Sequence, residues 1–280
     1  MDKTRVTAVI NTLNEQDNLP FLLRSLVTWV DEIVVVDMES TDDTLQIAQK
    51  YGARTYTYQR LGYADPARAF AISKASNLWI LMLDADEIVT KVFSEKVREI
   101  VNFDLADVVV FPWVNYLLGD RLQATGWGID QDFHPRLFKS SVVQATGEIH
   151  NFLHFSAESR ILTLAKSEEN AVIHFNYVNS KHFLEKMNRY TSIEALQLKK
   201  SGAKTSYFKL LLATSKEFVR RFLVFKGYKD GWRGVYLSLF MVFYKILTHA
   251  KLEELNSCGD ELEIKSKYAK IREKILEEFY

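Results

Sequence analysis

The sequence predicts an α/β fold, in which helices flank a mostly parallel sheet, followed by a helical C-terminal extension. Short β-branched apolar runs alternate with helix-like segments over the first hundred residues. These runs lack polar–apolar alternation, which is typical of parallel strands buried on both faces. Beyond about residue 180 the pattern is helical to the end. We therefore expect one α/β domain over residues 1–180 and a helical region over residues 181–280.

Each early element is predicted by its own run of residues. Leu19, Leu22, Leu23 and Leu26 recur near helical spacing, and Gly52 follows a second helical run as a stop. The aromatic segment after residue 111 precedes two further strand-like runs. The expected strands cover residues 6–10, 33–36, 54–58, 79–83, 108–111, 136–138 and 147–150, and the expected early helices cover residues 17–29, 44–51 and 67–76.

Composition excludes some function classes. Lys plus Arg and Asp plus Glu each number 36, so the formal net charge is zero, which argues against a nucleic-acid binder. The single Cys258 has no partner for an internal disulfide, and this suits a reducing compartment. The most apolar late stretch, residues 235–247, is shorter than the roughly 20 residues that span a bilayer. We expect a cytoplasmic protein without a signal peptide or a transmembrane helix.

Three polar clusters follow the predicted strands, at residues 11–15, 37–42 and 84–87. Ligands of parallel α/β sheets bind beyond the carboxyl ends of the strands. Asp84 and Asp86, one residue apart after an apolar strand, suit Mg²⁺ or Mn²⁺, because these cations prefer oxygen ligands and share them with substrate phosphates. The alternative is a simple turn with helix-capping acids.

The second cluster supports the ligand-site hypothesis. Ser40 or Thr41 is well placed as a helix N-cap. Capping does not require Asp37, which ends the preceding strand at the same edge as Asp84. Its carboxylate could accept hydrogen bonds from a ribose or a base.

Together these motifs resemble family 2 glycosyltransferases, which have the glycosyltransferase-A fold. The matching segments are Thr12-Leu13-Asn14-Glu15, residues 36–44, residues 62–72 with Arg68, and Leu83-Asp84-Ala85-Asp86-Glu87. They cover roughly the first ninety residues in the family's order. Many relatives have Asn where this chain has Ala69, so any role of that side chain is absent or reassigned.

The resemblance implies a role for each matching residue. Glu15 and Asp37 would contact the nucleoside, and Arg68 the base or the phosphates. Asp84 would contact the ribose or metal-bound water, and Asp86 would ligate Mn²⁺ or Mg²⁺. The implied donor-binding set is Thr12, Asn14, Glu15, Asp37, Arg68 and Asp84.

The middle segment resembles the branch that includes bacterial lipopolysaccharide-core glycosyltransferases. Asp132 precedes Arg136-Leu137-Phe138 by four residues, and Gly147-Glu148-Ile149-His150 follows, with Asn151 replacing the family's acid. An inverting transfer needs a base for the acceptor hydroxyl. Asp132 is the leading candidate, with Glu148 and Asp130 in reserve; the competing interpretation is that Asp132 merely pairs with Arg136.

The histidines are expected to have different roles. The resemblance allows His150 to complete the metal shell beside Asp86. His134 and His174 have no matching motif, and we expect them to be ordinary structural or surface groups.

The segment 204–233 predicts a membrane-binding surface. It carries eight basic and two acidic residues, interleaved with apolar and aromatic ones, which suits an anionic lipid surface. The alternative is a helix that packs its apolar side on the catalytic domain. The apolar run 234–247 could instead bury a homo-oligomer interface.

The expected function is metal-dependent, inverting transfer from a nucleotide-sugar, preferably a uridine diphosphate sugar. The acceptor would be a saccharide or lipid-linked acceptor of the bacterial envelope, at the inner face of the cytoplasmic membrane. One alternative is a catalytically inactive, membrane-associated scaffold. Another is a nucleotidyltransferase, although residues 11–15 lack the glycine and lysine of the usual phosphate loop.

Overall fold

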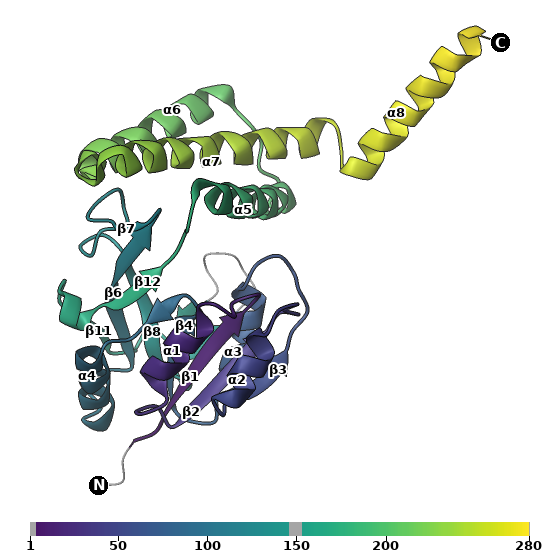
Figure 1. Cartoon of the computed structure of the whole chain (residues 1–280). Coiled ribbons are helices and arrows are strands. Elements are labelled where there is room, and N and C mark those ends of the chain that lie inside the picture. Colours follow the sequence, from purple (N-terminus) through teal and green to yellow (C-terminus); the bar gives the residue numbers. More distant parts are fainter. Residues whose placement is uncertain (1–3, 146–152, 280) are drawn as a thin grey trace. The chain divides into compact units, whose positions relative to one another are not determined.

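A computed structural model describes residues 4–145 and 153–279 of the chain. It divides into two compact units, Met1–Asn179 and Ser180–Tyr280, which are described separately. Figure 1 shows the sheet and its helices in the first unit and the helices of the second.

The first unit contains a mixed, ten-stranded sheet in its described part, with the main order β3-β2-β1-β4-β8-β6-β12-β5. Strands β7 and β11 pair with β6, and β9 and β10 form a separate antiparallel two-stranded sheet. The elements are β1 (Val6–Thr12), α1 (Leu19–Leu26), β2 (Glu32–Asp37), α2 (Thr44–Lys50), β3 (Arg54–Thr57), α3 (Asp65–Lys74), β4 (Trp79–Asp84), β5 (Glu87–Ile88), α4 (Lys91–Asn102), β6 (Val108–Leu117), β7 (Asp120–Arg121), β8 (Phe133–Lys139), β9 (Val143–Ala145), β10 (Leu153–Phe155), β11 (Ile161–Thr163), η1 (Glu168–Asn170) and β12 (Val172–Phe175).

The register of the parallel strands aligns their polar ends. Thr12 pairs with Asp37 across β1 and β2, and Asn11 pairs with Asp84 across β1 and β4. The clusters that follow these strands therefore meet at one edge, as the sequence predicts. Beyond β4 the sheet becomes mixed, because β8 runs antiparallel to both β4 and β6.

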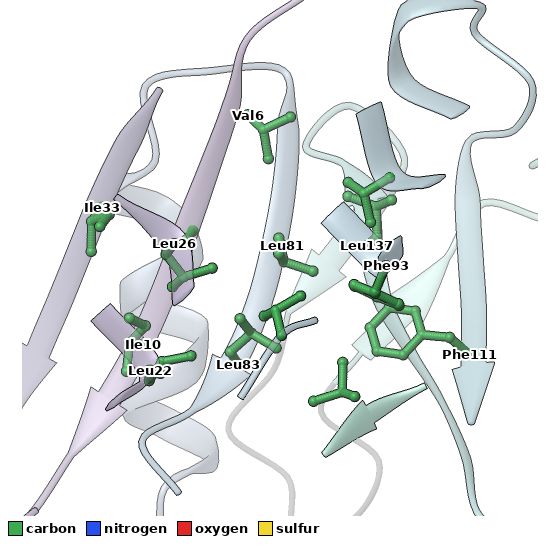
Figure 2. Close-up of a cluster of buried hydrophobic side chains, with 14 of the residues drawn as sticks. Val6, Ile10, Leu22, Leu26, Ile33, Leu81, Leu83, Phe93, Phe111 and Leu137 are labelled. Carbon is green, nitrogen blue, oxygen red and sulfur yellow. The ribbon is translucent and has the colours of Figure 1, made fainter. Parts of the chain in front are cut away.

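Buried apolar side chains cover both faces of this sheet. One cluster joins the sheet to α1 and α4, where Phe93 meets Phe111 edge to face at a centroid distance of 4.9 Å (Figure 2). The other joins it to α3 through Ala67, Ala71 and Ile72. Each fully buried Leu, Ile or Phe side chain contributes roughly 1.5–3 kcal/mol. Burial on both faces explains why the strands lack polar alternation.

Helix starts explain the small differences from the predicted bounds. Proline occupies the first turn of both α1 and α3, at Pro20 and Pro66. Its fixed φ and missing N–H suit that position, so each helix begins just before its proline. The expected strand at residues 147–150 lies outside the described residues. The α/β architecture with a helical C-terminal part is confirmed.

The second unit is helical, as predicted. Helix α7 packs against both α5 and α6. Its elements are α5 (Ser180–Lys200), α6 (Tyr207–Phe218), the π-helical η2 (Val219–Val224), η3 (Gly227–Asp230), α7 (Gly231–Ser257), α8 (Glu261–Leu276) and η4 (Glu277–Phe279).

The helical run Gly227–Ser257 is longer than the apolar stretch at residues 235–247. The expectation of no transmembrane helix was based on the length of that shorter stretch. By length and composition it could cross a membrane, with 22% of its apolar window buried. Core helices of water-soluble proteins meet the same criteria. The run therefore does not by itself establish a membrane span.

Candidate active site

The loops after β1 and β2 are hydrogen-bonded to each other at the carboxyl edge of the sheet. We call this pair of loops, residues 11–15 and 37–42, the clasp. The Asn14 N–H donates to Ser40 Oγ at 2.8 Å, and the Thr41 N–H donates to Asn14 Oδ1 at 2.8 Å. Asn14 and Glu39 adopt left-handed φ values of 57° and 60°. Non-glycine residues rarely adopt this conformation, and such strain concentrates at ligand sites. The clasp fixes the shape of the edge on which the predicted donor-binding residues lie.

Asp37 is the buried centre of this clasp. Its Oδ1 accepts from Thr12 Oγ1 at 3.0 Å and from Ser40 Oγ at 2.5 Å, and its Oδ2 accepts from the Ser40 N–H at 2.9 Å. The N-cap interpretation of Ser40 or Thr41 is wrong, because Asp43 is the N-cap of α2 and makes no side-chain cap bond. The Ser40 hydroxyl serves Asp37 instead of the helix.

Asp84 lies between two arginines. Arg68 Nη2 donates to Asp84 Oδ1 at 2.5 Å, and Arg136 Nη2 donates to Oδ2 at 3.1 Å. Arg68 is itself held by Asp65 at 2.9 Å. Burial opposes ionisation of Asp84, but the positive charges of Arg68 and Arg136 outweigh it and hold the pKa of this carboxyl well below its usual range. Asp84 is therefore an anion that its own chain already neutralises.

Glu87 is a fully buried acid next to Asp84 and its two arginine partners. Its Oε2 accepts from the Asp84 N–H at 3.0 Å, and its Oε1 has no hydrogen-bond partner among the described residues. Burial, reinforced by the negative charge of Asp84, raises the pKa of Glu87 to about 8. Near neutral pH the Glu87 side chain is thus largely protonated.

Asp86 differs from Asp84 in its partners. Its Oδ2 lies 3.5 Å from Nε2 of His174, and its side chain is 17% exposed. Burial lowers the pKa of His174, but the charge of Asp86 outweighs this, so the net shift is upward. A cavity of about 300 Å³ adjoins Asp86; it is lined by Asn18, Phe21, Asp86, Glu87, Ile88 and Phe175. The two acids have similar side-chain exposure, 20% for Asp84 and 17% for Asp86, but only Asp86 of the two lines this cavity.

Asp132 does not pair with Arg136, so that competing interpretation is wrong. Asp132 Oδ1 lies 2.7 Å from His134 Nε2, and Oδ2 accepts from Asn115 Nδ2 at 2.7 Å. Arg136 points instead to Asp84. Both carboxylate oxygens of the predicted base therefore have a side-chain partner within the first unit.

Sequence reasoning missed the residues that connect these acids. The ring of Trp113 lies between His134 and His174, at centroid distances of 4.0 and 4.7 Å, and the Arg136 guanidinium lies 5.0 Å from it. His134 and His174 therefore lie beside the predicted residues Asp132 and Asp86. The alternation of Trp113 and Asn115 along β6 places both on one face of that strand. On β8 the register against β6 shifts at Arg136, so alternation alone does not predict where this side chain lies.

Other predicted residues have different outcomes. Glu15 Oε2 accepts from Asn18 Nδ2 at 2.8 Å at the start of α1. Asp130 is exposed in the loop before β8. Glu148 and His150 lie outside the described residues. Within residues 4–145 and 153–279, no group of three or more His, Cys, Asp or Glu side chains is placed to hold a metal.

Curated relatives match nearly the whole chain. It is 28% identical to an uncharacterized glycosyltransferase of Rickettsia felis, over 89% of this chain and 90% of that protein. It is 24% identical to the lipopolysaccharide core biosynthesis glycosyltransferase LpsC of Rhizobium meliloti, over 89% of this chain and 92% of LpsC.

Solved structures and a family model give the remaining comparisons. The crystal structure of S. aureus TarS 1-349 in complex with UDP matches with a TM-score of 0.48 and 17% identity, over 92% of each chain. The model of glycosyl transferase family 2 matches residues 7–161. This match, together with the mixed sheet flanked by helices, confirms the predicted glycosyltransferase-A fold. The chain belongs to glycosyl transferase family 2.

Proposed function

We propose that this protein transfers a sugar, with inversion, from a uridine diphosphate sugar to a saccharide or lipid-linked acceptor of the bacterial envelope. The observation that carries the proposal is the unequal environment of two acids at the sheet edge. Asp84 is neutralised by Arg68 and Arg136, whereas Asp86 borders an open cavity. In this proposal Asp84 organises the site, and Asp86, which lies beside His174 and lines the cavity, contacts the ligand.

A divalent cation, Mn²⁺ or Mg²⁺, fits the donor atoms available. Asp86 offers a carboxylate, and such cations are usually held by one or two carboxylates together with substrate phosphates and water. Asp86, with the predicted ligand His150, would hold the ion, which when bound stabilises negative charge on the departing diphosphate.

The clasped loops form the nucleoside side of the site in this proposal. Glu15 and Asn14 lie at the rim, and Asp37 lies beneath them. Arg68, held by Asp65 and Asp84, brings positive charge to the same edge. That charge is suited to the base or the phosphates of the donor.

Asp132 would take the proton of the acceptor hydroxyl as that oxygen attacks the anomeric carbon. Asn115 and His134 hold its two oxygens, so the carboxylate keeps one orientation. Glu148 and Asp130 remain reserve predictions. The similarity to LpsC supports an acceptor in lipopolysaccharide synthesis.

The second unit supports association with the cytoplasmic face of the inner membrane. Exposed apolar side chains recur at helical spacing along α6 and again along α7. Lys209 and Lys216 lie on α6, and Lys226 and Lys229 follow it. A surface that is both apolar and basic suits anionic lipid. The exposed side chains are Tyr207, Phe208, Leu211 and Leu212 on α6 and Trp232, Val235, Tyr236, Leu239, Phe243 and Ile246 on α7.

Thermal unfolding with Mn²⁺ and a panel of nucleoside diphosphates tests the donor site. We expect UDP with Mn²⁺ to raise the Tm of the wild type and of Glu95→Ala, an exposed acid on α4 that serves as control. The Asp86→Ala variant should lose this shift, because Asp86 would hold the ion whose positive charge favours binding of the diphosphate. If no nucleotide stabilises the wild type, the donor site is disproved and the scaffold alternative replaces it.

A further inference from the structure

We propose that Asn115 is a positioning residue that joins the acceptor side of the site to its donor side. Its buried amide is the middle of a chain that runs from Asp86 through His174 and Asn115 to Asp132. The inference rests on the proposed function, in which Asp86 serves the donor and Asp132 the acceptor.

The orientation of the Asn115 amide follows from its partners. Nδ2 lies 3.0 Å from the Trp127 carbonyl oxygen and 2.7 Å from Asp132 Oδ2. A backbone carbonyl can only accept hydrogen bonds, so the amide must present its NH₂ group to this side. Asn115 Oδ1 then faces Nδ1 of His174 at 2.8 Å. Since Oδ1 can only accept, Nδ1 of His174 carries a hydrogen.

The same amide therefore fixes His174. With Nδ1 donating to Asn115, the Nε2 atom is directed to Asp86, 3.5 Å away. Strand pairing supports this placement, because His174 on β12 is the register partner of both Asn115 on β6 and Glu87 on β5. Trp113 packs on the His174 ring. The imidazole is thus oriented by ring packing on Trp113, by the hydrogen bond from Nδ1 to Asn115 and by the pairing of β12 with β6.

On the other side the amide fixes Asp132. Asn115 is 0% exposed, so water does not compete for its hydrogen bonds. Asp132 lies in the loop before β8, where its backbone oxygen accepts from the Trp113 N–H at 3.1 Å. Without the amide, His134 is the one side-chain partner that the carboxylate keeps within residues 4–145 and 153–279. A misplacement of about 1 Å can lower a catalytic rate by about 100-fold.

A double-mutant cycle tests the positioning role. The assay is release of UDP from UDP-N-acetylglucosamine and UDP-glucose with Mn²⁺ and water as acceptor, for Asn115→Leu, Asp132→Asn and the double variant. We expect Asn115→Leu to lower kcat by about 10- to 100-fold. The double variant should lose no more than Asp132→Asn alone, because residues that act as one unit are not additive. Val109→Ala, also 0% exposed on β6, controls for destabilisation.

A spectroscopic measurement tests the chain without activity. In ¹⁵N NMR of histidine-labelled protein, Nδ1 of His174 should be protonated in the wild type, and its resonance should shift in Asn115→Leu. An unprotonated Nδ1 would overturn the inference, as would additive losses of kcat or a loss in Val109→Ala equal to that in Asn115→Leu. Full activity of Asp132→Asn would overturn it together with the assignment of the base. Absence of UDP release by the wild type would instead overturn the proposed function itself.

Discussion

Arg136 donates to Asp84 across 52 residues of sequence, with Nη2 3.1 Å from Oδ2. This bond joins β8 to the end of β4 at the sheet edge. Its guanidinium also lies 5.0 Å from the Trp113 ring, and its side chain is 8% exposed. A buried arginine of this kind holds its carboxylate in one orientation and keeps it charged. Arg136 is therefore part of the site, although the sequence suggested it only as a partner for Asp132.

Replacing Arg136 with leucine should destabilise the first unit. Asp84 would keep Arg68 but lose its second donor, and a buried charged acceptor left short of partners costs about 1–3 kcal/mol. Urea denaturation measures the change. Arg160→Leu is the control, because Arg160 pairs with Asp104 and Asp107 while half exposed, where ion pairs contribute about 0–1 kcal/mol. Equal losses of stability in both variants would contradict the proposed contribution of the Arg136–Asp84 interaction.

Glu87 should make the metal-free protein less stable as pH rises. Its pKa is raised from 4.5 to about 8 in the folded state. The stability that this group contributes is therefore fully present below pH 4.5 and is lost as pH rises through 8. We expect Glu87→Gln, which stays neutral, to gain stability relative to the wild type between pH 5 and pH 8.5. Urea titrations across this window measure the difference, and a constant difference would contradict the prediction.

Asp84 does not obscure that measurement. Its folded-state pKa is lowered, so its contribution is present above the unfolded value of 3.8 and is lost only in acid. The two acids therefore act in separate pH windows. Asp84→Asn should lower stability above pH 3.8, and it should also reduce the slope between pH 5 and pH 8.5, because the Asp84 charge helps to raise the pKa of Glu87.

Ser40→Ala should loosen the clasp between the β1 and β2 loops. The hydroxyl donates to Asp37 and accepts from the Asn14 N–H, and hydrogen bonds to charged groups contribute about 1.5–3 kcal/mol. We expect a loss of that size in the free energy of unfolding and weaker UDP binding by calorimetry. Ser73→Ala on α3, where the hydroxyl donates to the Phe70 carbonyl oxygen of the same helix, should change neither. Unchanged UDP affinity in Ser40→Ala would separate the clasp from donor binding.

The α6 surface should bind anionic vesicles. Sedimentation with phosphatidylglycerol vesicles should retain the protein at low salt, and phosphatidylcholine vesicles should not. Lys209→Gln with Lys216→Gln should weaken binding, since each basic residue near such a surface contributes about 1 kcal/mol. Leu262→Ser on α8, 75% exposed, is the control for loss of exposed apolar area, whereas Phe208→Ser should reduce binding. Failure of the vesicles to retain the wild type would contradict the prediction and favour a homo-oligomer interface in place of lipid. Equal retention of all variants would show that α6 is not the lipid-binding surface.

The sequence by itself determined the parallel half of the sheet and the edge where Thr12, Asp37 and Asp84 meet. Buried parallel strands appear in a sequence as continuous apolar runs. Because the strands are parallel, their carboxyl ends lie at the same edge of the sheet whatever path the connecting segments take. The predicted strand at residues 108–111 was too short, because β6 continues to Leu117 through an aromatic segment that has no clear period. Asn115 lies in that continuation.

Only the tertiary structure decided the partners of the buried polar groups. Asp132 and Arg136 are four residues apart, yet Asp132 bonds to Asn115 and His134, while Arg136 crosses to Asp84. His174 reaches Asp86 because β12 pairs with β5. Periodicity in a sequence reports whether a residue is buried, which is a local property. The partner of a buried charge depends on which distant strands pair and in which register, and that is settled by packing of the whole sheet.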